Sequence, residues 1–526
     1  MEKKFLLAII LSVGVLYLWN MFTYTPSVTT ANTSQLSTQK EGKDSPLLES
    51  ILVETPQVIP TQQVQEKLTY LENDLLLISL SNVGGSIESV TIKEFNRELP
   101  ITNIAGVKGL EDVVFEEFRV NDTKIEFVSN TESGRIRKSY DLDGYLVKMS
   151  VDVDNLDKMS KLNNLSVVGY QIDAARMDIS SKDMAIQRDK TLNEYAVKYG
   201  KKEHRKSKAY KFKEKERKDE SGAIQWVAFR DRYFCAIVKP TTETSGFSID
   251  PEDTTHLSVI INTENTSKLD AVAYFGPEDN VILKKYDLGF EAVKKYYRFG
   301  LFDFMGKIIN QIIHLIYEVV PNWGVCILIM SVLIYFSMYP LTKKSMLSMK
   351  KMQSVAPKIN AIKEKHKNDK QKLNAEMMDI YKREKINPIG GCLPVLFQMP
   401  IFLGLYQVLW RSVSFKGAKF LWIQDLTEPD RLMIFPFTMP VLGNELNILP
   451  LFMVVIMFFQ QKFSSKNMIT TDPMQKQQQQ MMMYMMPLFL GFIFYKFSSG
   501  LTLYFTMFYL FSTITQWRMS RDVKVG

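Results

Sequence analysis

The pattern of hydrophobic and polar positions divides the chain into two unlike parts. Between residues 66 and 298, short apolar or alternating runs such as Leu75–Ser81 and Tyr145–Val153 are punctuated by Asn, Asp and Gly. Runs of this length with period two are typical of β-strands. After residue 300 the apolar runs are longer and carry few charges. The pattern predicts a large β-sandwich over residues 66–298, followed by a membrane α-helical bundle.

Six apolar stretches are predicted to cross the membrane as helices. The first lies in residues 1–24; it follows Lys3 and Lys4 and offers no small-residue cleavage site, which favours an uncleaved signal anchor over a signal peptide. The second lies in residues 322–341. Residues 389–518 hold the remaining four, at about 392–410, 448–460, 481–497 and 501–517.

The distribution of charge predicts which side of the membrane each connecting segment occupies. Lys and Arg near the ends of spans are retained in the cytoplasm. With the N-terminus inside, the cytoplasmic segments hold twenty-one basic residues, whereas the outer loop of residues 411–447 holds four basic and four acidic residues. Both termini, including the tail of residues 519–526, are therefore expected in the cytoplasm, and the β-sandwich is expected on the outer side.

Three shorter segments connect these parts. Residues 25–65 are rich in Ser, Thr, Gln and Pro and lack apolar periodicity, as expected of a flexible tether. Residues 299–321 place apolar side chains on one helical face, which predicts an amphipathic helix in the outer interface or, alternatively, one packed on the sandwich. Residues 342–388 carry thirteen basic and five acidic residues and predict two antiparallel helices of about twenty residues with a turn near residues 367–370.

This basic cytoplasmic hairpin offers a surface for anionic partners. The candidates are anionic lipid headgroups, the ribosome or a nascent chain. The alternative is that its charge only sets the topology of the chain. The candidate contact residues are Lys343, Lys344, Lys350, Lys351, Lys363 and Lys365.

The remaining chemistry of the sequence argues against catalysis. The three Cys form no evident pair, and the four His, at 204, 256, 314 and 366, lack the spacing of metal ligands. We find no nucleotide loop and no acid, base or nucleophile constellation, so we predict no cofactor, no metal and no enzymatic activity. The basic run of residues 198–218 is expected on the outer side, where nucleic acid is scarce, and is interpreted as a solvated loop or hairpin rather than a DNA-binding site.

Several motifs after residue 320 resemble, in the same order, those of the YidC family of membrane protein insertases. They include Asn322-Trp-Gly, Met338-Tyr-Pro-Leu-Thr-Lys343, Asn387-Pro-Ile-Gly-Gly-Cys392, Gln398-Met-Pro-Ile-Phe402 and Thr471-Asp-Pro-Met474. The anchor and the large outer domain resemble the long, Gram-negative-type members. The resemblance implies a bacterial inner-membrane protein with a periplasmic β-supersandwich and five spans that form the insertase core around a hydrophilic groove. It also implies client membrane proteins and the Sec translocon as partners.

A polar groove has a physical purpose in such a protein. One charge at mid-bilayer costs about 2.5 to 3.5 kcal/mol on insertion scales, so polar partners part-way across lower the barrier for a client's polar tail. Each candidate could instead form an ordinary interhelical hydrogen bond. The candidate groove residues are Ser331, Tyr335, Ser337, Gln398, Tyr406, Tyr504, Phe505, Thr506 and Ser512.

One position departs from the family pattern. Family members commonly carry an Arg five places before the Pro of the Met-Tyr-Pro-Leu-Thr run, and this chain has Tyr335 there. Either the Tyr335 hydroxyl serves in its place or clients are selected differently. The sequence therefore predicts an insertase and membrane chaperone, acting alone or with the Sec translocon. A small-solute transporter or channel is the alternative, and a membrane-embedded hydrolase is a third class.

Overall fold

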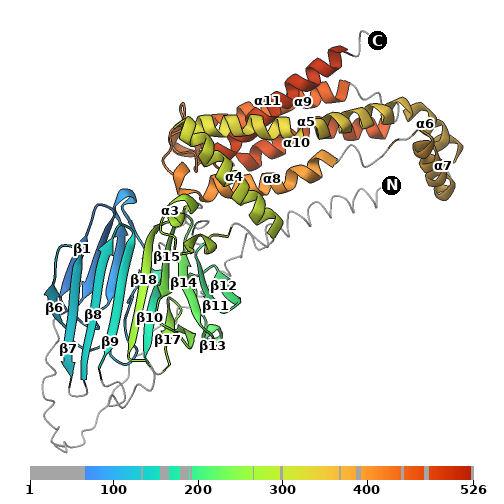
Figure 1. The fold of residues 1–526 in the computed structure, drawn as a ribbon. Helices are drawn as coiled ribbons and strands as arrows, with labels where there is room; N and C mark the ends of the chain where they lie inside the picture. The colour runs from blue at the N-terminus through green and yellow to red at the C-terminus, as the bar shows by residue number, and fades with distance from the viewer. Residues whose placement is uncertain are drawn as a thin grey trace, which may run out of the picture. The chain divides into compact units, whose positions relative to one another are not determined.

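The structure is a computed structural model of the chain (Figure 1). It describes residues 66–131, 134–154, 165–177, 189, 192–264, 266–295, 300–366, 369–384, 386, 393–439, 443–466 and 473–522. The predicted signal anchor and tether lie outside the described residues. Val64–Gly526 belong to one structural unit.

The described part of the β-rich region consists of three antiparallel sheets (Figure 1). The nine-stranded sheet has the order β12-β11-β14-β15-β18-β9-β8-β7-β6, the five-stranded sheet β13-β16-β17-β10-β5, and the four-stranded sheet β1-β2-β3-β4. The strands of the first are β6 (Glu116–Arg119), β7 (Lys124–Thr131), β8 (Gly134–Asp143), β9 (Leu146–Val153), β11 (Glu194–Tyr199), β12 (Lys202–Ser207), β14 (Ile224–Arg230), β15 (Phe234–Pro240) and β18 (Lys268–Pro277). Those of the others are β1 (Leu68–Glu72), β2 (Leu76–Ser81), β3 (Ile87–Ile92), β4 (Arg97–Glu98), β5 (Ile101–Thr102), β10 (Ser166–Asp173), β13 (Lys218–Ser221), β16 (Gly246–Pro251) and β17 (His256–Asn262).

One continuous hydrophobic core receives side chains from all three sheets, for example Ile78, Tyr170 and Phe229. The prediction of a β-rich region is thus confirmed. Part of the basic run lies on β12, which pairs with β11 as a hairpin, whereas Ala209 and Phe212 of the same run are buried in the core.

A buried lysine also joins the sheets. Lys138 lies on the inward face of β8, and its ammonium donates to the carbonyl oxygens of Gly84 at 2.6 Å and Ala105 at 2.8 Å. Burial lowers the pKa of Lys138 to about 7. Since Gly84 follows β2 and Ala105 follows β5, this side chain ties the nine-stranded sheet to loops of the other two.

The rest of the described chain is mainly helical. Its elements are α3 (Asn280–Lys284), α4 (Gly300–Val319), α5 (Trp323–Ser354), α6 (Ala356–Lys365), α7 (Lys370–Arg383), α8 (Leu393–Arg411), α9 (Ile448–Lys466), α10 (Pro473–Phe494) and α11 (Ser499–Asp522), with a hairpin of β19 (Met433–Met439) and β20 (Gly443–Leu446). Helices thus occupy the positions of the second to sixth predicted spans.

These helices differ in the length of their apolar stretches. Within the described residues, Trp323–Ser348 is the one stretch of helix that is both long and apolar enough to cross a membrane. Ile448–Phe463 and Met483–Phe494 are apolar but shorter. The first predicted span lies outside the described residues, so a total of six spans stays a prediction.

The helix that holds the second predicted span extends beyond it. Instead of stopping near residue 341, α5 continues past Pro340 to Ser354. A proline removes one backbone donor and can kink a helix without ending it. The hairpin therefore consists of α6 and α7 alone, which are about 15 and 21 Å long at 1.5 Å per residue and so shorter than the predicted twenty-residue helices. Of the predicted turn, residues 367–368 lie outside the described residues, Asp369 caps α7 and Lys370 begins it.

The predicted amphipathic helix is α4, and its buried face packs on the bundle. Ile309 and Ile313 belong to the same hydrophobic core as Leu405 and Leu409 of α8. At Gly404 an added Cβ would lie 3.0 Å from the backbone nitrogen of Gly306, so the two helices approach closely. The apolar face of α4 thus packs on α8, while His314 of the same helix contacts Asp279, which follows β18.

Candidate functional site

Polar side chains that are buried or half-buried lie on α5, α8 and α11. We call this set the polar seam; its members are Ser331, Tyr335, Gln398, Tyr504, Thr506, Ser512, Thr515 and Gln516. All but Thr515 and Gln516 are among the candidate groove residues above.

Two hydrogen bonds of the polar seam join different helices. The Tyr335 hydroxyl of α5 donates to Thr515 Oγ1 of α11. Gln398 Nε2 of α8 donates to the Tyr504 hydroxyl of α11 at 2.9 Å. Residues that are far apart in the sequence, on three helices, are thus brought to one side of α11.

Other hydroxyls of the polar seam bond to their own helix. Ser331 Oγ donates to the carbonyl oxygen of Ile327, and Thr506 Oγ1 donates to that of Thr502, both at 2.7 Å. A hydroxyl that donates in this way keeps its lone pairs as acceptors. These buried positions can therefore still receive a hydrogen bond from water or from another chain.

Three buried glutamine carbonyl oxygens have no hydrogen-bond partner among the described residues. They are Oε1 of Gln407 on α8, Gln460 on α9 and Gln516 on α11. A buried acceptor left without a partner costs about 1–3 kcal/mol, so such groups in a bundle point to water or to a polar ligand. Sequence reasoning missed Gln460 and Gln516; the available signal was the Gln460-Gln461 pair at the end of one apolar run and Gln516 near the end of another.

Three candidate groove residues lie outside the polar seam. Ser337 is exposed. Tyr406 stacks on Trp410, with ring centroids 5.1 Å apart, and Phe505 packs edge-on to Phe494 at 5.0 Å. The last two therefore take part in aromatic packing.

A loop segment covers one end of the bundle. We call residues 412–430 the seal; Phe415, Ile423 and Leu426 of this segment are buried in the core of the bundle. The backbone N–H of Gly500 donates to Leu426 O at 2.9 Å, which fixes the seal to the first turn of α11. The seal follows the last residue of α8, whereas the hairpin of α6 and α7 precedes its first, so the two lie towards opposite ends of this helix.

The candidate hairpin contacts are distributed over two elements. Lys343, Lys344 and Lys351 are exposed on the extension of α5, rather than on the hairpin itself. Lys363 is half-buried on α6, and exposed Lys365 lies 4.0 Å from Glu376. The side chain of Lys350 lies outside the described residues.

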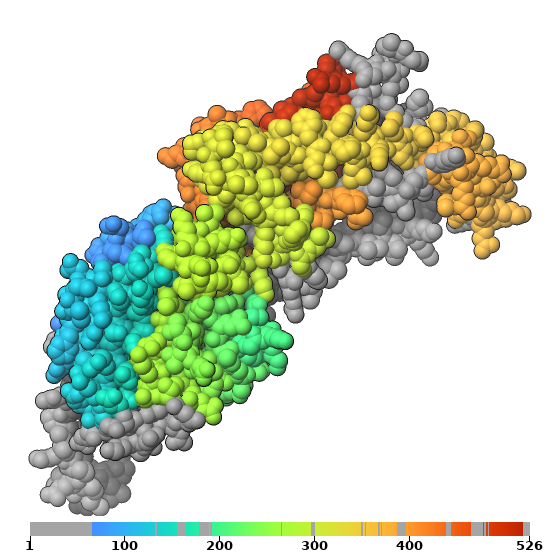
Figure 2. All heavy atoms as spheres, in the orientation of Figure 1, coloured from blue at the N-terminus to red at the C-terminus, as the bar shows by residue number. Residues whose placement is uncertain are grey.

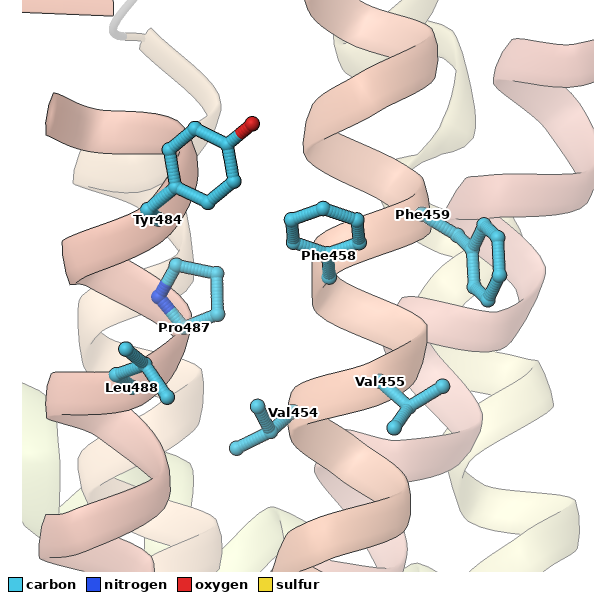
Figure 3. Close-up of a pocket in the computed structure, with 7 residues that line it drawn as sticks. All are labelled: Val454, Val455, Phe458, Phe459, Tyr484, Pro487 and Leu488. Atoms are coloured by element: carbon cyan, nitrogen blue, oxygen red, sulfur yellow. The ribbon is translucent and has the colours of Figure 1, made fainter. Parts of the chain in front are cut away.

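An apolar cavity of about 370 Å³ lies between α9 and α10 (Figure 3). Its lining residues are Val454, Val455, Phe458, Phe459, Tyr484, Pro487 and Leu488. Since many of these side chains are also exposed, the cavity opens to the surroundings of the bundle and suits an apolar group.

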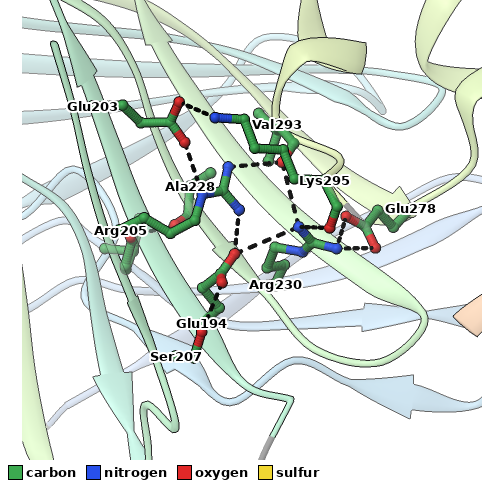
Figure 4. A network of polar contacts seen from close by, with 10 residues as sticks. Glu194, Glu203, Arg205, Ser207, Ala228, Arg230, Glu278, Val293 and Lys295 are labelled. Carbon is green, nitrogen blue, oxygen red and sulfur yellow. Dashed lines mark hydrogen bonds and ion pairs between the residues drawn. The ribbon is translucent and has the colours of Figure 1, made fainter. Parts of the chain in front are cut away.

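The β-rich region contains a buried network of charges (Figure 4). The Arg230 guanidinium lies 2.6 Å from Glu278 Oε1 and donates to the carbonyl oxygen of Lys295 at 3.1 Å. The Arg205 guanidinium donates to the carbonyl oxygen of Val293 at 2.9 Å. Burial would raise the pKa of Glu194, but the charges of Arg230 and Arg205 overcome this and lower it. Because these charges are paired, the network serves to fasten the segment that leads towards α4 onto β11, β12 and β14.

Comparisons with known proteins agree with this architecture. The family model described as 60Kd inner membrane protein matches residues 315–525, and that of the YidC periplasmic domain matches residues 116–312. The membrane protein insertase YidC of Pelodictyon phaeoclathratiforme is 29% identical over 496 residues, which cover 87% of this chain and 83% of that protein. That of Janthinobacterium sp. is 31% identical over 319 residues, 59% of this chain and 54% of that protein.

A solved structure described as "Active YidC insertase crystal structure with the first transmembrane domain resolved" covers 86% of this chain and 93% of its own, with a TM-score of 0.38 and 15% identity. The match to the periplasmic domain covers β6 to β18 and ends within α4, and the match to the inner membrane protein begins within α4 and covers α5 to α11, which defines an inner-membrane protein with a periplasmic domain. The chain belongs to the YidC family of membrane protein insertases.

Proposed function

We propose that this chain inserts and helps to fold client membrane proteins by giving their polar segments a hydrated resting place along the polar seam. The observation that carries the proposal is the pair of interhelical bonds of Tyr335 and Gln398, together with the buried Gln516 carbonyl oxygen, which has no hydrogen-bond partner among the described residues. Polar groups at membrane depth are expensive unless they are matched. A tail that exchanges bulk water for such groups meets a lower barrier than one that enters hydrocarbon.

The seal favours an insertase over an open pore. A transporter or channel needs a path through both ends of the bundle. Here Ile423 and Leu426 are buried in the core at one end, and the first turn of α11 is hydrogen-bonded to the seal. This arrangement supports a pocket open to one side, from which the client's apolar part leaves into lipid, driven by roughly 25 cal/mol per Å² of buried apolar surface.

The proposed topology follows from charge. We place both termini and the hairpin in the cytoplasm, six spans in the inner membrane and the β-rich region, as a supersandwich, in the periplasm. Exposed Lys343, Lys344 and Lys351 suit anionic lipid headgroups or a ribosome-bound nascent chain. The Sec translocon is the proposed partner for larger clients, and no covalent catalysis is involved.

Reconstitution tests this function. Purified full-length protein in liposomes receives a single-span client with a short acidic tail, and the protease-protected fraction of the tail is measured. We expect protection, and we expect the double variant Gln398→Leu/Tyr504→Phe to reduce the initial rate of protection about five- to tenfold because it removes a polar pair worth about 1 kcal/mol or more. Gln477→Leu, at an exposed position of α10, is the matched control and should retain the full rate.

Two outcomes count against the proposal. Ion flux through the liposomes without tail protection would favour the channel. Equal rates for the double variant and the control would remove the polar seam from the mechanism.

A further inference from the structure

The hairpin of β19 and β20 exposes apolar side chains on both of its faces. The consecutive residues Met433 and Ile434 are 53% and 63% exposed, and Phe437 is 58% exposed. Successive residues of a strand point to opposite faces, so a hairpin that packs on a protein surface would bury one of each pair. A bare apolar strand of this kind in water is an aggregation hazard. The working protein must therefore cover it.

The base of this hairpin is fixed to the ends of two apolar helices. Asn447 stands between β20 and α9, and its Nδ2 donates to the carbonyl oxygen of Tyr495 at 2.8 Å, just after α10. The Tyr495 hydroxyl donates to Glu445 O of β20 at 2.7 Å. Asp430 accepts from the backbone N–H groups of Ile448 at 2.9 Å and Leu449 at 3.0 Å and so caps α9. The hairpin thus stands at a defined level, at the beginning of α9.

The exposed apolar surface continues from the hairpin along α9. Large apolar side chains on one side of this helix are exposed along its length, namely Leu451, Phe452, Val455 and Phe459. Trp422 of the seal contacts Phe452, with ring centroids 6.4 Å apart. In a protein of the inner membrane, such a stripe on an apolar helix faces lipid.

The length of α9 also indicates that lipid covers this surface. Its apolar stretch Ile448–Phe463 measures about 24 Å at 1.5 Å per residue, which is less than the hydrocarbon core of about 30 Å. An apolar hairpin at its beginning supplies apolar surface at the end where the helix is too short. Two exposed basic side chains lie near the hairpin. Arg431 Nε lies 2.9 Å from Glu445 Oε1 of β20. Lys496 Nζ would lie 3.5 Å from a Cβ atom added to Gly443 at the start of β20. They suit phosphate headgroups.

We propose that the β19–β20 hairpin is a lipid-inserting element that holds the beginning of α9 in the membrane interface. Ile434 and Phe437 enter the acyl-chain boundary. The backbone limits the depth, because β19 pairs with β20 only along one edge, through Met433↔Leu446, Ile434↔Glu445 and Met439↔Gly443. The other edge needs water, which keeps the hairpin about 5–10 Å below the headgroups at most. The proposal requires that α9 crosses the membrane and does not depend on the polar seam.

Photocrosslinking tests the occupant directly. Full-length protein carrying p-benzoylphenylalanine in place of Phe437 is reconstituted in vesicles of phosphatidylcholine and phosphatidylglycerol, irradiated and analysed by mass spectrometry. Gln424, which is exposed in the seal, is the matched control position. We expect phospholipid adducts at 437 and few or none at 424. Adducts to polypeptide alone at 437 would show that a second strand covers this edge and would overturn the proposal, as would equal lipid adducts at both positions.

Fluorescence quenching supplies a second readout with a conservative change. The Trp fluorescence of Phe437→Trp is measured in unbrominated lipid and in lipid with brominated acyl chains. The fluorescence of the unsubstituted protein in each lipid is subtracted, which leaves the signal of the introduced Trp. We expect at least about twofold quenching for Phe437→Trp, as for a ring at the acyl boundary, and little for Gln424→Trp. Because both variants are measured in the same vesicles, unquenched emission from Phe437→Trp would contradict the proposal even where crosslinking fails.

Discussion

The hydroxyl of Tyr335 on α5 donates a hydrogen bond to Thr515 Oγ1 on α11. Its ring lies between aromatic side chains of α11, with centroids 5.8 Å from Phe508 and 5.7 Å from Phe511. Tyr335 occupies the position at which the family commonly carries an Arg. The structure thus places the neutral Tyr335 hydroxyl, bonded to α11, at the position where the family resemblance implies a cation. Among the buried residues of the described helices, the one with a charged side chain is Arg411, the last residue of α8.

The first prediction concerns this hydroxyl. Tyr335→Phe keeps the ring packing but removes the bond to Thr515, which is worth about 1 kcal/mol, so we expect the initial rate of client insertion to fall about fivefold. Tyr335→Arg should restore or exceed the original rate for clients with acidic tails and lower it for clients with basic tails. Tyr339→Phe, one turn along α5, is the control. Protease protection in liposomes measures all three, and unchanged rates for both Tyr335 variants would exclude this residue from the mechanism.

A second prediction concerns the close approach between Gly324 and the seal. A Cβ built at Gly324 would lie 2.1 to 2.5 Å from atoms of Phe420. We expect Gly324→Ala to destabilise the protein by about 1–3 kcal/mol through overpacking, seen as a lower temperature of unfolding in detergent. Adding Phe420→Ala should recover part of the loss, because the two residues are coupled.

Gly300→Ala is the control for this experiment. Apart from its chain neighbours and the backbone of its own helix, no heavy atom of the described residues lies within 4 Å of a Cβ built at Gly300, so its effect should stay within about 0.5 kcal/mol. A double variant that is less stable than Gly324→Ala alone would show that the contact with Phe420 is not the cause.

The positions of the helices could be predicted because long apolar runs report them directly. The extension of α5 to Ser354 could not, since residues 342–354 are polar enough to suit either a spanning helix or a hairpin. The seal was also missed. Ile423 and Leu426 lie in a loop, and their burial depends on Gly324 and Gly500, which are distant in the sequence. Local patterns carry no information on such pairs.

The same limit applies to the sheets and to the candidate site. Alternation predicted strands, but β9 pairs with β18, with Val151 opposite Leu269, across more than a hundred residues. Tyr335, Gln398 and Tyr504 could be selected as polar residues in apolar helices, partly through the family resemblance. Which of them meet, and that Tyr406 and Phe505 join aromatic packing instead, depends on how the helices are rotated about their axes.

A third prediction concerns Arg232, which holds the seal. Its guanidinium donates to Trp410 O at 2.9 Å and Thr427 O at 3.1 Å, and it pairs with Glu428 at 3.0 Å. We expect Arg232→Ala to weaken the seal by about 2–3 kcal/mol, less than for a fully buried pair because Glu428 keeps contact with water. Hydrogen exchange of residues 412–430 should then accelerate about thirty- to 150-fold.

Arg176→Ala is the matched control for Arg232. Arg176 pairs with Glu98 at 2.8 Å, but both side chains are largely accessible, so the loss should stay below about 1 kcal/mol. If Arg232→Ala leaves the hydrogen-exchange rate of the seal unchanged, other contacts hold this segment in place.

The fourth prediction is a pH dependence at the junction of α3 and α4. His314 Nε2 lies 3.4 Å from Asp279 Oδ2, its Nδ1 lies 2.8 Å from Asn310 O, and its ring contacts Trp323. Ser414 of the seal also approaches Nε2, at 3.4 Å. Burial would lower the pKa of His314, and so would the charge of Lys294, but the hydrogen bond and charge of Asp279 raise it. Conversely, burial would raise the pKa of Asp279, but His314 and Lys294 lower it.

The sign of the effect follows from these two shifts. The raised pKa of His314 contributes stability that is fully present below its unfolded pKa of about 6.5 and is lost as the pH rises through the folded pKa. The lowered pKa of Asp279 contributes stability that is present above about pH 4 and is lost as the pH falls through its folded pKa. The pair is therefore strongest between about pH 4 and 6.5.

We expect His314→Gln to cost about 1.5–3 kcal/mol at pH 6 and much less at pH 9, measured as the difference in unfolding temperature from the unsubstituted protein. Asp279→Asn should abolish this pH dependence, and a His314→Gln effect of equal size at both pH values would show that packing, rather than the charge pair, accounts for it.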